Sequence, residues 1–252
     1  MSKDKPARKK LNRKQKERRT LLFSIAAGIG IVGTAMAGFI PLDRIRKKRL
    51  RPPGALKPDL FLASCIKCGQ CVQVCPVEAI VLADYDDGFG IGVPYIDARG
   101  QACDFSCDAV QCVLACPTGS LSHDIDKKEQ VKMGLARLTH PDTCLARKGE
   151  GFKGLARGPD FQGMHRYSEI DRWKPLKISD HPYDLDICDL CVRECPVKDA
   201  ISMEPMSNDP NDKRLTPVIH EACVGCGMCE MICPTEQASI EIDIGAIWGE
   251  NA

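Results

Sequence analysis

The sequence predicts an α+β protein made of small cysteine-rich units in tandem, preceded by an N-terminal apolar helix or signal. The chain of 252 residues has 16 cysteines but only 7 Phe, 4 Tyr and 2 Trp. Aromatic side chains supply much of the buried area of ordinary cores, so metal ligation is expected to hold the folded part together. The cysteines recur in runs that end in Cys-Pro, and a basic arm with an uncharged stretch precedes them.

The first and last cysteine runs have identical spacing. In each, three cysteines separated by two residues are followed by a fourth after three more residues, and then by a proline. These runs extend from Cys65 to Pro76 and from Cys223 to Pro234. Bacterial ferredoxins hold [4Fe–4S] clusters with such a run, in which the fourth cysteine usually ligates the other cluster of a two-cluster unit. The predicted fold is therefore tandem bacterial-ferredoxin-like, with two units of two clusters each.

The second run is a variant with wider spacing. It extends from Cys103 to Pro117, and its gaps of three, four and three residues replace the usual two, two and three. The Cys-Pro ending is retained. A flexible loop can still bring these thiolates to adjacent irons, so the same kind of site is expected.

The third run is split. Cys188–Pro196 contains three cysteines, and Cys144 is the only one left to complete the set. The sequence positions of Cys75 and Cys103, of Cys116 and Cys144, and of Cys195 and Cys223 each differ by 28. Cys144 thus stands where a third motif should begin, and residues 145–187 are interpreted as an insertion within that motif.

All sixteen cysteines are expected to ligate iron in four [4Fe–4S] clusters. Disulfides and a structural zinc protein are the competing interpretations, and the repeated Cys-Pro spacing argues against both. Two pairings of motifs are open: first with second and third with fourth, or first with fourth and second with third. The expected ligands are Cys65, Cys68, Cys71, Cys75, Cys103, Cys107, Cys112, Cys116, Cys144, Cys188, Cys191, Cys195, Cys223, Cys226, Cys229 and Cys233.

The N-terminal segment resembles an export signal. Residues 1–19 form a basic arm that is not expected to fold alone, and Leu21–Ile40 is a run of twenty uncharged residues. That length just suffices to span a bilayer as a helix. Arg18 and Arg19 before the run resemble a twin-arginine signal, and Ala35-Met36-Ala37 is a candidate cleavage site.

The orientation of the segment follows from its flanking charges. The positive-inside rule keeps the longer N-terminal arm in the cytoplasm, which places the cluster domain on the periplasmic side of the inner membrane, anchored or exported by the twin-arginine route. A second basic run at 44–51 favours the opposite orientation, with the domain at the cytoplasmic face. Export is the favoured interpretation, because the twin-arginine route carries folded proteins with cofactors already inserted.

The sequence also predicts short secondary-structure elements and the boundaries of the segments. After the Cys-Pro of the first run, Val77–Asp84 is expected to form a short helix and a strand, and Val93–Asp97 a second strand. The insertion is interpreted as a docking surface or a lid, and its His165 and His181 as ordinary surface residues. The expected segments are 1–19 (basic arm), 20–40 (signal or transmembrane anchor), 41–60 (linker), 61–140 (motifs 1 and 2), 141–243 (motifs 3 and 4) and 244–252 (tail).

The charge distribution and the absence of catalytic motifs argue against several classes of function. Residues 1–51 hold sixteen Lys or Arg and three Asp or Glu, a net charge of +13, whereas the remaining 201 residues carry −12. An acidic domain suits a basic partner face, or the acidic residues keep a cluster protein soluble, and either interpretation argues against nucleic acid. The sequence has no Cys-x-x-Cys-His haem site, no phosphate-binding glycine loop and no nucleophile motif. We therefore expect an electron-transfer protein with no catalytic residues and no substrate site of its own.

The chain resembles the NapG/MauM ferredoxin-type proteins over most of its length. The resemblance rests on the N-terminal segment, Arg-Pro-Pro-Gly-Ala at 51–55, Cys65–Pro76, Cys112–Pro117 and Cys223–Cys233. It implies four [4Fe–4S] clusters and electron transfer from a membrane quinol dehydrogenase to a periplasmic reductase or cytochrome chain, or electron handling beside a methylamine oxidation system. A tightly bound iron–sulfur subunit of a molybdenum-type oxidoreductase is the alternative.

Overall fold

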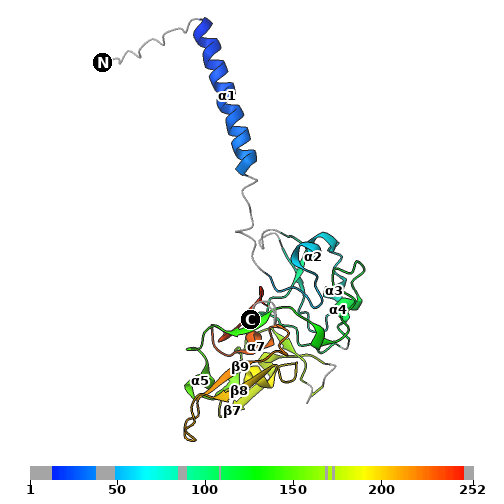
Figure 1. Ribbon diagram of the computed structural model, residues 1–252, viewed down its shortest axis with the longest axis vertical. Helices are drawn as coiled ribbons and strands as arrows, with labels where there is room; N and C mark the ends of the chain where they lie inside the picture. The colour runs from blue at the N-terminus through cyan, green and yellow to red at the C-terminus, as the bar shows by residue number, and fades with distance from the viewer. Residues whose placement is uncertain are drawn as a thin grey trace, which may run out of the picture. The chain divides into compact units, whose positions relative to one another are not determined.

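The structure, a computed structural model, describes residues 13–37, 49–84, 90–107, 109–167, 170–171 and 174–246. The chain divides into two compact units, Met1–Arg46 and Lys47–Ala252. Among the described residues, the first unit contains the helix α1 and the second contains all other elements (Figure 1).

Helix α1 extends over Arg13–Ala37. It begins inside the basic arm, although that arm was expected not to fold by itself. The Arg, Lys, Gln and Glu residues of the arm are good helix formers and extend the helix of the apolar run. Residues 38–40 of that run lie outside the described residues. Arg18 and Arg19 are exposed on α1. Of the helices that the structure describes, none is both long and apolar enough to cross a membrane.

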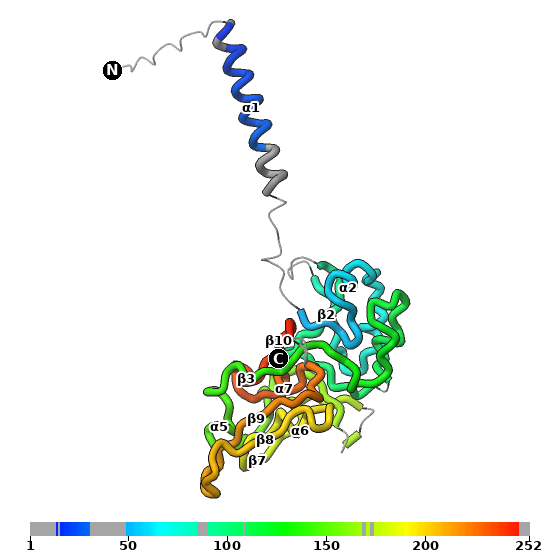
Figure 2. The backbone as a smooth tube through the Cα atoms, in the orientation of Figure 1, coloured from blue at the N-terminus to red at the C-terminus, as the bar shows by residue number. Residues whose placement is uncertain are grey.

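Each cysteine motif contributes a helix of about one turn. Helix α3 lies against α4, and α6 lies against α7, so the four helices form two pairs. Each pair joins consecutive motifs: Figure 1 labels α3 and α4, and Figure 2 labels α6 and α7. The helices are α3 (Gln70–Gln73), α4 (Gln111–Leu114), α6 (Leu190–Arg193) and α7 (Met228–Ile232).

Antiparallel strands repeat in the same way as the helices. Between the motifs of the first pair, β1 (Val81–Leu82) pairs with β2 (Pro94–Tyr95), and between those of the second, β8 (Ile201–Pro205) pairs with β9 (Leu215–Ile219). A second connection links the chain before each pair to the chain after it. It is a single bridge between Ala55 and Leu121 in the first pair. These elements form two ferredoxin-like units of related construction within Lys47–Ala252. The first contains the first and second cysteine motifs, and the second contains the third and fourth.

In the second ferredoxin-like unit, the connection between the chain before the motifs and the chain after them is a full strand pair. Strand β3 (Leu135–Leu138) precedes the third motif, and β10 (Ile240–Asp243) follows the fourth. They pair antiparallel with Ile240 opposite Leu138, and Figure 2 shows them side by side although about a hundred residues separate them.

The prediction of a short helix after the first Cys-Pro is wrong. Residues 76–77 form a turn, and the only regular element of Val77–Asp84 is the two-residue strand β1. Glu78 has φ +54°, a left-handed conformation that stops a right-handed helix. The strand expected at Val93–Asp97 is present but shorter, as β2, and residues 85–89 before it lie outside the described residues.

The insertion has secondary structure of its own. Strand β4 pairs with β7, and β5 pairs with β6. Its Ala156, Tyr167, Ile178 and Tyr183 are buried, so this segment is packed into the body of the protein. Its elements are α5 (Leu145–Lys148), β4 (Phe152–Leu155), β5 (Met164–His165), β6 (Leu176–Lys177), the 3₁₀ turn η4 (Ile178–Asp180) and β7 (Pro182–Leu185). The remaining elements are α2 (Pro58–Ser64), before the first motif, and η3 (Lys128–Gln130), before β3.

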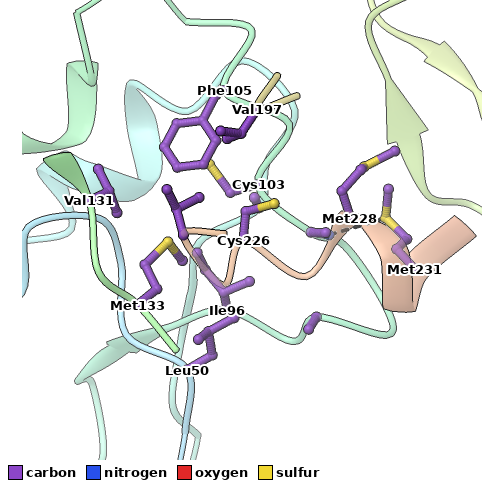
Figure 3. Close-up of a cluster of buried hydrophobic side chains, with 14 of the residues drawn as sticks. Leu50, Ile96, Cys103, Phe105, Val131, Met133, Val197, Cys226, Met228 and Met231 are labelled. Atoms are coloured by element: carbon purple, nitrogen blue, oxygen red, sulfur yellow. Dashed lines mark hydrogen bonds between the residues drawn. The ribbon is translucent and has the colours of Figure 1, made fainter. Parts of the chain in front are cut away.

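One apolar core joins the two ferredoxin-like units. Figure 3 shows Cys103 of the second motif beside Cys226 of the fourth, with Phe105 and Ile96 packed around them. The backbone N–H of Cys103 donates to the carbonyl of Cys226 at 3.3 Å. The units therefore meet at cysteine-bearing loops.

Close backbone contact at Gly225 predicts a large effect of a small substitution. Gly225 has φ +71°, and a Cβ there would collide with the backbone of Gly134. Gly225→Ala should lower the free energy of unfolding by at least about 3 kcal/mol, since it adds a backbone clash to left-handed strain. Gly119→Ala is the control: Gly119 has φ +67° but open space around it, so its loss should be about 1–2 kcal/mol. Anaerobic urea unfolding measures both, and equal losses would contradict the proposed contact.

Candidate iron–sulfur sites

Three cavities are each lined by at least four cysteines that come from two motifs, and the cavity of Cys144 is also lined by Cys229 of the fourth motif. Each contains three cysteines of one motif and the Cys-Pro cysteine of another. The lining sets are set 1 (Cys65, Cys68, Cys71, Cys116), set 4 (Cys195, Cys223, Cys226, Cys229) and set 3 (Cys144, Cys188, Cys191, Cys233).

The four remaining cysteines also lie together, and we call them set 2 (Cys75, Cys103, Cys107, Cys112). Burial, together with the nearby sulfur atoms of Cys107 and Cys75, raises the pKa of Cys112 to about 12. Burial likewise raises the pKa of Cys103, with a contribution from Cys112. The wider spacing of the second motif therefore does not keep its cysteines apart.

The sets answer the question of pairing that the sequence leaves open. Cys75 and Cys116 are exchanged between the first and second motifs, and Cys195 and Cys233 between the third and fourth. Cys144 lies with Cys188 and Cys191, although forty-three residues separate it from the rest of its motif. The structure gathers the cysteines as first with second and third with fourth.

The spatial order of the sets differs from their order in the chain. Cys71 of set 1 is near Cys112 of set 2. Cys103 of set 2 contacts Cys226 of set 4, and Cys229 of set 4 is close to Cys191 of set 3. The order in space is therefore 1, 2, 4, 3, with sets 1 and 3 at the two ends.

The donors surround cavities and do not converge on a point. All sixteen cysteines are free thiols, and among the described residues no three His, Cys, Asp or Glu side chains are close enough together to hold a single metal ion. A [4Fe–4S] cluster takes four separate cysteine thiolates. Soft, buried sulfur donors also suit iron, whose charge stabilises thiolates that burial disfavours. The residues present therefore fit such a cluster.

Left-handed residues shape the cysteine loops. Gly69 (φ +75°) precedes α3, and Gly227 (φ +89°) precedes α7. Val110 takes this position before α4 at φ +45°, which is unusual for a β-branched residue. Asp189 before α6 has φ −127°. No tight wrap is needed there, because Cys144 reaches its set from a distant part of the chain.

Backbone N–H groups donate to the sulfur atoms of three of the four exchanged cysteines. The amide of Ala79 donates to Cys75 Sγ at 3.2 Å, that of Leu121 to Cys116 Sγ at 3.5 Å, and that of Ser239 to Cys233 Sγ at 3.4 Å. Burial tends to raise the pKa of Cys116, but hydrogen bonds from Leu121 and Thr118 outweigh this effect and lower it. Such bonds stabilise thiolates and tune the potential of a bound cluster.

Two arginines that the sequence analysis did not single out hold the loop of Cys233. The half-buried guanidinium of Arg99 donates to the carbonyls of Glu230 and Cys233 through Nη1, and to those of Thr235 and Glu236 through Nη2. Arg157, from the insertion, donates to the carbonyls of Arg99 and Met231. No motif reveals these roles, since the acceptors are backbone groups at least 58 residues away.

The expectation that His165 is an ordinary surface residue is wrong. His165 is only 7% exposed, and its ring nitrogens face Asp104 and Glu194. His181 is half-buried and stacks on Tyr167 with ring centroids 4.0 Å apart. Burial of a histidine depends on pairing by distant carboxylates, which spacing along the chain does not show.

Repeated cysteine sets on a ferredoxin-like framework define an iron–sulfur protein, and comparisons with known proteins agree. The model of the 4Fe-4S dicluster domain matches residues 64–146 and 186–237. The unmatched stretch between them nearly coincides with the predicted insertion. No solved structure matches.

Curated relatives cover most of the chain. NapG, the "Ferredoxin-type protein" of Escherichia coli (strain K12), is 34% identical over 221 residues, which are 86% of this chain and 80% of the relative. The "Methylamine utilization ferredoxin-type protein MauM" of Paracoccus denitrificans is 34% identical over 239 residues, 91% of this chain and 88% of the relative. The MauM of Methylorubrum extorquens is 32% identical over 235 residues, which are 91% of this chain and 90% of the relative.

The chain belongs to the NapG/MauM family of ferredoxin-type proteins. It is an iron–sulfur electron carrier without a substrate site of its own, as the sequence analysis expected.

Proposed function

We propose that this protein carries four [4Fe–4S] clusters, one in each cysteine set, and relays electrons between a membrane quinol dehydrogenase and a periplasmic reductase or cytochrome chain. The observation that carries the proposal is the division of all sixteen cysteines into four sets of four. A bound cluster supplies reversible one-electron chemistry at a potential that its surroundings tune.

The protein's own residues supply ligands, exclude water and leave one end accessible. Apolar side chains such as Phe61, Val197 and Met228 line the cavities. Cys68, in set 1, is the one exposed cysteine among the sixteen. This exposure favours the end at set 1 as the place where a redox partner approaches.

The N-terminal segment supports export to the periplasmic side of the inner membrane, with membrane association. Its charge of +13 precedes a remainder of −12, and Arg18-Arg19 stands just before the uncharged run. Electron transfer beside a methylamine oxidation system is the second candidate, because the relative MauM is as similar as NapG and is named for methylamine utilization.

The exchange of cysteines predicts which cluster each one serves. Cys75→Ser should alter the same redox-poised EPR signal as Cys107→Ser, because both belong to set 2. Cys116→Ser should alter the signal that Cys68→Ser alters, because both belong to set 1. The measurement is anaerobic EPR with iron and sulfide analysis of each variant. If Cys75→Ser changed the same signal as Cys68→Ser, the exchange would be refuted.

Export by the twin-arginine route is tested by a substitution that conserves charge. The double variant Arg18→Lys, Arg19→Lys should remain in the cytoplasm, because the route reads the arginines themselves. The matched control Lys14→Arg, Lys16→Arg changes two neighbouring cations of the same helix and should leave export intact. Cell fractionation with immunodetection measures both. Equal export of the two variants would sink the twin-arginine proposal.

The proposed partners are tested by affinity capture of the full chain from native membranes. The expected result is co-purification of a membrane quinol-oxidising protein, and reduction of the captured clusters when a quinol is added under anaerobic conditions. A stable stoichiometric complex with a large molybdenum-type catalytic subunit, and no reduction by quinol, would instead establish the alternative of a tightly bound oxidoreductase subunit.

A further inference from the structure

A buried histidine links the two ferredoxin-like units. His165 lies on β5, within the insertion, with Nε2 3.1 Å from Glu194 Oε2 and Nδ1 3.6 Å from Asp104 Oδ2. The side chains of all three residues are at most 9% exposed. The imidazole ring of His165 thus lies between a carboxylate of the first ferredoxin-like unit and a carboxylate of the second.

The two carboxylates belong to residues next to proposed iron ligands of adjoining sets. Asp104 follows Cys103 of set 2, and Glu194 precedes Cys195 of set 4. These two sets meet where the backbone N–H of Cys103 donates to the carbonyl of Cys226. The acid–histidine–acid group therefore lies at the junction in the middle of the 1, 2, 4, 3 order.

Other groups hold each carboxylate in place. Asp104 Oδ1 accepts from the backbone N–H and the hydroxyl of Ser106, and Oδ2 accepts from the backbone N–H of Arg166 at 3.1 Å. Glu194 Oε1 accepts from the hydroxyl of Tyr183 at 3.1 Å, and that hydroxyl lies 3.0 Å from the hydroxyl of Tyr167. Neither carboxylate can readily turn toward solvent, so both require a nearby positive charge.

His165 supplies that charge. Burial by itself would lower the pKa of His165, but the adjacent Asp104 and Glu194 outweigh it and raise the pKa to about 9. A buried carboxylate without such a partner is costly. The group is therefore two negative charges and one positive charge.

We propose that His165 is a positioning and charge-compensating residue, through which the insertion holds the two units together and sets the reduction potentials at sets 2 and 4. This inference rests on the proposed function, because it presupposes clusters in these sets. Reduction adds negative charge, so an uncompensated carboxylate beside a ligand makes reduction less favourable. His165 offsets Asp104 and Glu194 for both sets at once.

The test is a redox titration of the intact protein followed by EPR, with signals assigned by one cysteine variant for each set. His165→Gln removes the positive charge and retains a hydrogen-bond donor. We expect the midpoint potentials at sets 2 and 4 to fall while those at sets 1 and 3 stay unchanged. His181→Gln is the matched control from the same insertion, since His181 stacks on Tyr167 and forms no ion pair among the described residues. It should change none of the four midpoint potentials.

Charge compensation gives a second, opposite readout that does not depend on the folding of one variant. Glu194→Gln should raise the potential at set 4, and Asp104→Asn that at set 2. The double variant His165→Gln, Glu194→Gln removes one charge of each sign, so its set 4 potential should return toward that of the parent protein. Unchanged potentials, or equal shifts at all four sets, would overturn the inference. Parent protein without iron–sulfur signals would instead overturn the proposed function.

Discussion

The exchange of cysteines between neighbouring motifs is the constraint on which the rest of the structure depends. Cys75 and Cys116 cross between the first two motifs, and Cys195 and Cys233 between the last two. No motif completes a set alone, so two motifs must pack together before either site exists. Metal binding free energy is then folding free energy for a whole unit. This explains how a chain with so few aromatic residues sustains a compact body.

The same constraint determines how the two units join. Each Cys-Pro cysteine belongs to a set inside its own ferredoxin-like unit. The two units contact each other through the cysteine loops of the second and fourth motifs, at Cys103 and Cys226. The resulting order, 1, 2, 4, 3, places sets 1 and 3 at the ends. The insertion spans this junction through His165 and supports the Cys233 loop through Arg157. Several of its side chains pack into the interior of the protein, although its length and composition had suggested a lid or a docking surface.

Local signals predicted the cysteine motifs well and the backbone between them less well. Spacing alone indicated the runs and the place of Cys144, because ligation requires thiols at fixed separations along a wrapped loop. It failed at residues 77–84, where Glu78 at φ +54° ends any helix. It also failed at His165, whose burial depends on Asp104 and Glu194 from distant segments. These outcomes depend on contacts that propensity and periodicity do not contain.

By itself, the sequence determined that the chain is a repeated cysteine protein of the ferredoxin type with an insertion in its third motif. It did so because cluster ligation imposes a strict local spacing, which is visible without any tertiary contact. Only the tertiary structure decided which motifs exchange Cys75, Cys116, Cys195 and Cys233, in what order the sets lie, and what the insertion contacts. All sixteen cysteines are chemically identical, so either pairing satisfies the same spacing, and the packing of α3 against α4 and of α6 against α7 makes the choice.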